Sequence, residues 1–111
     1  MEKMLQSIGT SIKSNAKLHW ASTDFLEKQK VHPWSDMPVW VPGGGEGGGF
    51  SRRSNKRAIA KGLTFRPLSQ TAPETLAWFK TLPAERQATL KAGIKPEREK
   101  EVLAALGAIK H

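Results

Sequence analysis

The stretch PEREKEVLAALG, residues 96–107, decides much of what the sequence says about the fold. Pro96 is tolerated in the first turn of a helix, where its missing N–H would have no partner. Gly107 is typical of the position just after a helix end, so it is expected to close this one. The apolar residues between and beyond them recur at helical spacing. The stretch therefore predicts an amphipathic terminal helix with an apolar face formed by Val102, Leu103, Leu106 and Ile109.

Similar patterns upstream predict several further helices. Ser22 and Asp24 offer N-caps to a short helix, and Thr71–Glu74 reads as a capping box. The expected helices cover residues 3–14, 25–30, 55–61, a segment starting at Thr71 and a segment running from Pro83 to about residue 91.

Short strands are expected between the helices. The alternation in residues 16–21 and 63–68 favours β structure, and residues 33–42, with three prolines, are expected to be extended. The predicted fold class is α+β, a small mostly helical lobe of five or six helices with two or three short strands. With 111 residues, the chain is expected to form one domain over 1–111.

The glycine-rich stretch VPGGGEGGGF, residues 41–50, formally matches a dinucleotide-binding fingerprint. That fingerprint needs a buried strand before it, a helix starting at its last glycine and an acid about twenty residues later. Here prolines precede the glycines, Phe50 and two arginines follow closely, and the next acid after Glu46 is Glu74. We therefore expect no cofactor-binding residues, and interpret residues 42–49 as a flexible loop.

The chain lacks the residues that several other catalytic mechanisms require. The chain has no cysteine and no tyrosine, which excludes thiolate nucleophiles and tyrosine acids or bases. The three histidines have no metal-ligand spacing, so no metal site and no catalytic residue are predicted. The first fifteen residues hold no long apolar run, so we expect no signal peptide, no membrane association and a cytoplasmic location.

The charge is uneven along the chain. The formal net charge is +8, and none of it arises from residues 1–46. Residues 47–73 contain six basic residues and no acid. Such a run suits an anionic partner, and Arg52 and Arg53 could hold phosphate or carboxylate oxygens. A basic nucleic-acid-binding protein is therefore an alternative, although no familiar groove-reading motif supports it. An interaction domain without a ligand is a further alternative.

The order of several segments resembles a known family. They are HPWSDMPVWVP (32–42), GFSRRSNKRA (49–58), GLTFRPL (62–68), ETLAW (74–78) and PEREKEVLAA (96–105). Together they resemble the C-terminal end of extended short-chain dehydrogenases/reductases, in the NAD-dependent epimerase/dehydratase family and its isoflavone-reductase-like branch. The resemblance spans about Met4 to Ile109. The family's Rossmann domain and its Tyr-x-x-x-Lys dyad have no counterpart, and GGGEGGG replaces the acidic loop usual after WVP.

The resemblance implies a substrate-binding lobe of an NAD(P)-dependent reductase or epimerase. Such a lobe would bind no cofactor itself and would have no activity alone. A partner chain with a Rossmann domain would supply NAD(P) and catalysis, or the lobe would associate with itself. The substrate-binding residues expected from matched position and chemistry are Trp34, Trp40, Phe50 and Arg52.

Overall fold

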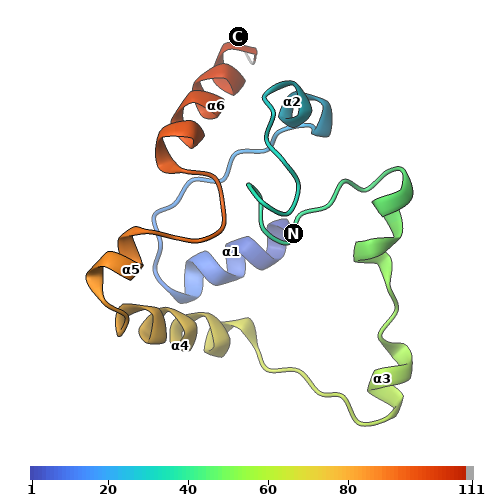
Figure 1. Ribbon diagram of the computed structural model, residues 1–111. Coiled ribbons are helices and arrows are strands. Elements are labelled where there is room, and N and C mark those ends of the chain that lie inside the picture. Colours follow the sequence, from blue (N-terminus) through green and yellow to red (C-terminus); the bar gives the residue numbers. More distant parts are fainter. Residues whose placement is uncertain (110–111) are drawn as a thin grey trace. The chain divides into compact units, whose positions relative to one another are not determined.

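The computed structural model describes residues 1–109 and is mostly helical (Figure 1). About 55% of these described residues are helical. The elements, in chain order, are α1 (Glu2–Ser11), α2 (Thr23–Lys28), the 3-10 helix η1 (Glu46–Arg52), α3 (Lys56–Ala60), α4 (Leu68–Lys80), α5 (Ala84–Ala88) and α6 (Pro96–Ile109).

The expectation of an α+β fold with short strands is wrong. Residues 1–109 form no sheet, and their one β feature is an isolated bridge between Pro33 and Met37. Residues 16–21 and 63–67 are irregular instead, with Leu18, Trp20 and Phe65 exposed. Alternation alone cannot make a strand stable, because a strand needs a neighbour to receive its backbone hydrogen bonds. Neither segment has one in the described part of the chain.

The protein divides into two compact units, each assembled from two separate segments. The α1–α4 unit contains residues 1–18 and 55–90, with helices α1, α3, α4 and α5. The α2–α6 unit contains residues 19–54 and 91–111, with α2, η1 and α6. The expectation of a single domain over 1–111 stays a prediction.

In the α1–α4 unit, helices α1 and α4 pack against each other. Helix α4 begins at Leu68, three residues before the expected capping box, because Pro67 already holds a φ of −60° at the N-cap. Pro73 consequently lies inside the helix. At the other end, the Gln87 amide donates to the backbone oxygens of Lys80 at 3.1 Å and Leu82 at 2.7 Å. Gln87 thereby satisfies carbonyls that the helix end would leave unpaired.

The α2–α6 unit contains the buried core. Ser22 caps α2 as expected, with its hydroxyl oxygen accepting the Phe25 N–H at 3.2 Å. Helix α6 starts at Pro96 as expected but continues through Gly107 to Ile109. Only part of its predicted apolar face is buried. The core residues are Phe25, Leu26, Val31, Val102 and Leu106, with Ala21, Trp40, Ile94 and Ala105 packed against them.

Polar contacts also join the two segments of this unit. The Gly93 N–H donates to the Ser35 oxygen at 3.0 Å, and the Ile94 N–H to the Asp36 oxygen at 2.7 Å. The Arg98 guanidinium donates to the Gln29 oxygen at 2.5 Å, and its other nitrogen contacts Glu101 at 2.8 Å. Arg98 thus ties α6 to the carbonyl end of α2.

Replacement of Arg98 by methionine is expected to destabilise the protein by about 1–2 kcal/mol, because the Gln29 carbonyl loses a charged donor in a partly buried place. Urea denaturation followed by circular dichroism measures this difference. Lys100→Met is the matched control, since Lys100 is an exposed cation on the same helix. Equal midpoints for the two variants would show that the Arg98 contact contributes nothing.

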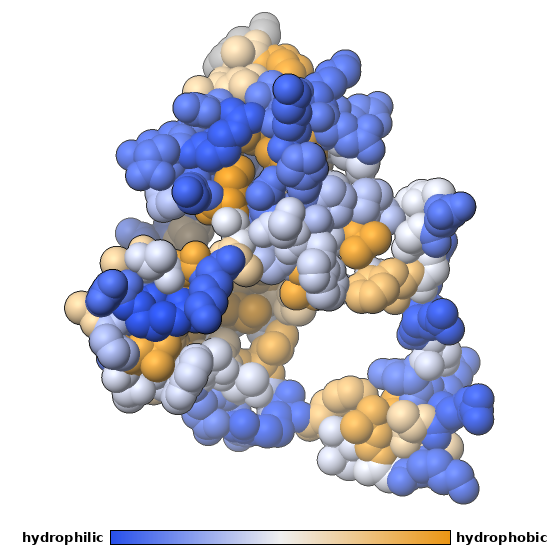
Figure 2. Space-filling view, in the orientation of Figure 1, coloured by the Kyte–Doolittle hydropathy of each residue, from blue (hydrophilic) through white to orange (hydrophobic). Residues whose placement is uncertain are grey.

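Large apolar side chains remain exposed in both units. Figure 2 shows hydrophobic surface, in orange, gathered over α3 and the chain beside it. Ile59 and Leu63, which belong to this region, are 47% and 43% exposed. Five core residues cannot cover the remaining apolar side chains, so both units present apolar surface to solvent.

Candidate functional site

The segment 33–42, expected to be extended, instead folds back on itself. The Asp36 carboxylate accepts the His32 N–H at 2.7 Å, and the Trp34 N–H donates to the Trp40 oxygen at 3.1 Å. Trp34 and Val39 have positive φ values of 68° and 67°. A β-branched residue at positive φ is strained, so the surrounding hydrogen bonds must hold this conformation. The result is a compact loop in which the backbone of Trp40 returns to that of Trp34.

This loop places Trp34 against Phe50. The two ring centroids lie 5.8 Å apart and the ring planes are at 89°, an edge-to-face pair. Such a pair is favourable by about 0.5–1.5 kcal/mol beyond the area it buries. Trp34 nevertheless stays 58% exposed and Phe50 54% exposed. This pair, the aromatic corner, is therefore open to solvent in the α2–α6 unit.

Arg52 lies at the end of η1, two residues after Phe50. Its guanidinium folds back over the glycine loop, because a Cβ added to Gly48 would meet the Arg52 Nη2 atom at 2.9 Å and the Gly43 oxygen at 2.7 Å. Arg52 is exposed and forms no ion pair with any carboxylate in residues 1–109. A guanidinium in this state can bind a carboxylate or phosphate through two parallel hydrogen bonds.

The four expected substrate-binding residues therefore divide into two groups. Trp34 and Phe50 are in contact, and Arg52 belongs to the same short helix as Phe50. Trp40 is instead half-buried and packs against the core. Its carbonyl oxygen still fixes the backbone of Trp34. Trp40 therefore supports the loop. Trp34 and Phe50 form the exposed corner, and Arg52 lies two residues after Phe50 on η1.

The glycine loop itself has local structure. Its second half is η1, and the Gly48 N–H donates to the Gly45 oxygen at 3.1 Å. Gly45 has a φ of 64°, which a residue with a Cβ adopts only with strain. The expected flexibility of residues 42–49 stays a prediction, to be measured by amide exchange.

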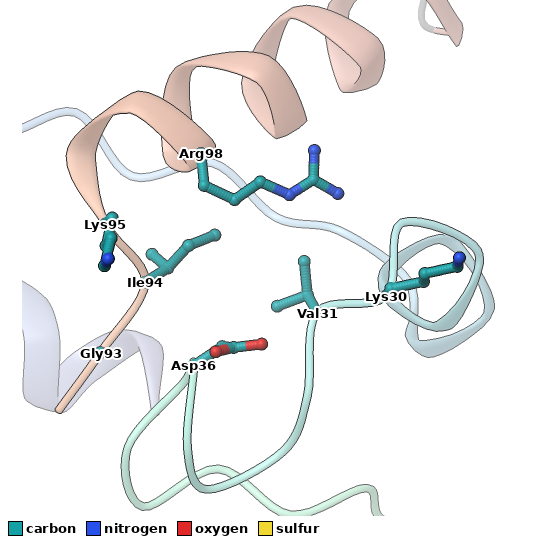
Figure 3. Close-up of a pocket in the computed structure, with 7 residues that line it drawn as sticks. All are labelled: Lys30, Val31, Asp36, Gly93, Ile94, Lys95 and Arg98. Carbon is teal, nitrogen blue, oxygen red and sulfur yellow. The ribbon is translucent and has the colours of Figure 1, made fainter.

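A small cavity that the sequence did not indicate lies in the same unit (Figure 3). Its volume is about 250 Å³, and it is lined by Lys30, Val31, Asp36, Gly93, Ile94, Lys95 and Arg98. Figure 3 shows the Lys30 side chain directed away from the cavity and the Arg98 chain crossing above Val31. Asp36 and Arg98 are already engaged by the hydrogen bonds described above. Of the charged lining residues this leaves Lys95, so the cavity offers little chemistry for binding a ligand.

Among residues 1–109, no three histidine or carboxylate side chains come together as they would around a metal ion. None of the helices there has the length and apolar character needed to span a bilayer.

Comparison with known proteins returned no relatives. No family model, no curated protein and no solved structure matches the chain. The likeness to short-chain dehydrogenases/reductases accordingly rests on the sequence segments alone.

Proposed function

We propose that this chain supplies the substrate-binding part of an NAD(P)-dependent reductase or epimerase and has no activity by itself. The observation that carries the proposal is the exposed corner in which Trp34 meets Phe50 edge to face, with the exposed Arg52 on the same short helix as Phe50. These are three of the four residues that the family resemblance selects.

The chemistry of this corner favours a planar or apolar substrate that carries an anionic group. The aromatic edges supply rigid contact area with little conformational entropy to lose. Arg52 supplies a bidentate partner for a carboxylate or a phosphate. The corner contains no acid, base or nucleophile, so its role is binding and orientation.

Two features support the absence of catalysis and of cofactor binding in this chain. The sequence contains no tyrosine, which the catalytic dyad of the resembled family requires. The glycine loop leads into a seven-residue 3-10 helix, with the Gly48 N–H bonded to Gly45. A dinucleotide site would instead need the free N–H groups of an α-helix start directed at the pyrophosphate.

An NMR titration with cinnamate, a planar carboxylate, tests the proposal. We expect the indole signal of Trp34 to shift, with a dissociation constant on the order of 1 mM, because a lobe alone provides only part of a site. Arg52→Gln is expected to weaken binding at least about tenfold, by loss of a charged hydrogen bond. Chemical shifts of labelled protein give both constants.

Arg53→Gln is the matched control, because it removes the same charge from the adjacent position. Cinnamyl alcohol, which lacks the carboxylate, should bind more weakly than cinnamate and be insensitive to Arg52→Gln. NADPH should cause no comparable shifts. Equal losses in the two arginine variants, or micromolar binding of NADPH, would refute the proposal.

A further inference from the structure

Helices α1 and α4 form an apolar groove in the α1–α4 unit, separate from the aromatic corner. Its volume is about 390 Å³, and it is lined by Ile8, Ile12, Leu68, Thr71, Ala72, Thr75, Leu76, Trp78 and Phe79. Trp78 is 62% exposed, although it is the largest side chain of the lining. Every lining residue is apolar except two threonines, so water gains few hydrogen bonds in this groove.

The geometry of the groove suits a helix. Its α4 wall runs from Leu68 to Phe79, about 17 Å or three helical turns. Figure 1 shows α1 and α4 running in the same direction beside each other. A groove between two packed helices can accept a third helix. The apolar side chains of the third helix then lie between the side chains of the other two, as in ordinary helix packing.

The charge of the unit indicates what kind of helix fits. Residues 1–18 and 55–90 contain nine lysines and arginines but only three glutamates. The α2–α6 unit also contains nine lysines and arginines, but these are offset by seven aspartates and glutamates. One of the three glutamates, Glu74, is paired with Arg66 at 2.7 Å. Lys13 and Lys80 follow the groove residues Ile12 and Phe79 directly, and neither forms an ion pair within residues 1–109.

We propose that the α1–α4 groove binds an acidic amphipathic helix of a partner protein. The partner would lay about three turns of apolar residues along α4 and place acidic side chains beside Lys13 and Lys80. Attraction between opposite charges would orient the helix and speed its association. A second copy of this chain suits the groove poorly, because it would bring the same excess of positive charge. The proposal does not depend on the function proposed for the aromatic corner.

Fluorescence anisotropy of a designed peptide tests this proposal on the full chain. The probe is an 18-residue helical peptide. Its leucines are spaced alternately three and four residues apart, so that they form one stripe, and its other residues are glutamate and alanine. The matched peptide has lysine in place of each glutamate. We expect the acidic peptide to bind at least about tenfold more tightly than the basic one, with the difference shrinking at high salt.

Two variants of α4 test whether the peptide binds in the groove. Thr75→Glu introduces a negative charge at an exposed position of the lining and is expected to weaken acidic-peptide binding at least about tenfold. Gln70→Glu adds the same charge at an exposed position of α4 outside the lining and should leave binding within about twofold. Circular dichroism of both variants serves as the control for correct folding.

The remaining outcomes each contradict the proposal. Equal binding of the two peptides would remove the charge argument, and equal affinities of the two variants would place the peptide elsewhere. A concentration-dependent dimer that Thr75→Glu dissociates would assign the groove to a second copy of the chain. Displacement of the peptide by phosphatidylserine vesicles, but not by phosphatidylcholine vesicles, would assign it to an anionic lipid surface.

Discussion

Leu106→Ala is expected to unfold the α2–α6 unit under conditions in which the unchanged protein is folded. Leu106 is 8% exposed and belongs to a core that, within residues 1–109, contains only five buried residues. Removing a buried leucine side chain costs about 2–5 kcal/mol, and a small domain has only about 5–15 kcal/mol in total. With so few core residues, little surrounding structure can rearrange to fill the cavity.

Leu103→Ala provides the control for this loss. Leu103 is the same residue type on the same helix but is 37% exposed, so we expect a cost below about 1 kcal/mol. Thermal unfolding followed through helical and tryptophan circular dichroism compares the two variants. Similar melting temperatures for both would mean that Leu106 does not belong to a cooperative core.

Gly48→Ala is expected to disrupt the aromatic corner without unfolding the protein. Its new Cβ would lie 2.7 Å from the Gly43 oxygen and 2.9 Å from the Arg52 guanidinium. The arginine end can move but the carbonyl cannot move alone, so both Arg52 and the loop must shift. We expect cinnamate affinity to fall at least about fivefold, which corresponds to about 1 kcal/mol.

Gly44→Ala is the matched control, because a Cβ at Gly44 meets no atom within 4 Å. It should leave cinnamate binding unchanged within about twofold and stiffen the unfolded chain slightly. If the two alanine variants bind cinnamate equally, the close approach of Gly48 to Arg52 plays no part in binding.

Local sequence signals predicted helices well where a cap or a periodic apolar face marked them. The Ser22 cap of α2 and the start of α6 at Pro96 are confirmed. The strands were wrong because alternation of side chains does not show whether a pairing partner exists. The starting point of α4 was missed because a proline at position 67 and a proline at position 73 compete to define the same helix start.

The candidate site could be predicted as a set of residues but not as an arrangement. Trp34, Phe50 and Arg52 were selected by residue type and by resemblance, and their role in binding stays a prediction. The reversal of the loop that brings Trp34 to Phe50 depends on positive φ at Trp34 and Val39, neither of which is a glycine that would mark it. The contact of Arg98 with Gln29 was also invisible, because nothing in an isolated arginine indicates a carbonyl so distant in sequence.

The alternation of the two units along the chain has a consequence for folding. The segment between α1 and α4 contains α2, and the segment between α2 and α6 contains α4. Each packing therefore closes a long loop, and closing that loop costs chain entropy. Whichever pair forms first roughly halves the effective loop of the other and lowers its closure cost by about 0.6 kcal/mol. Chain connectivity alone thus couples the two units, and cleavage between Ser54 and Asn55 would place the two segments of each unit on separate chains.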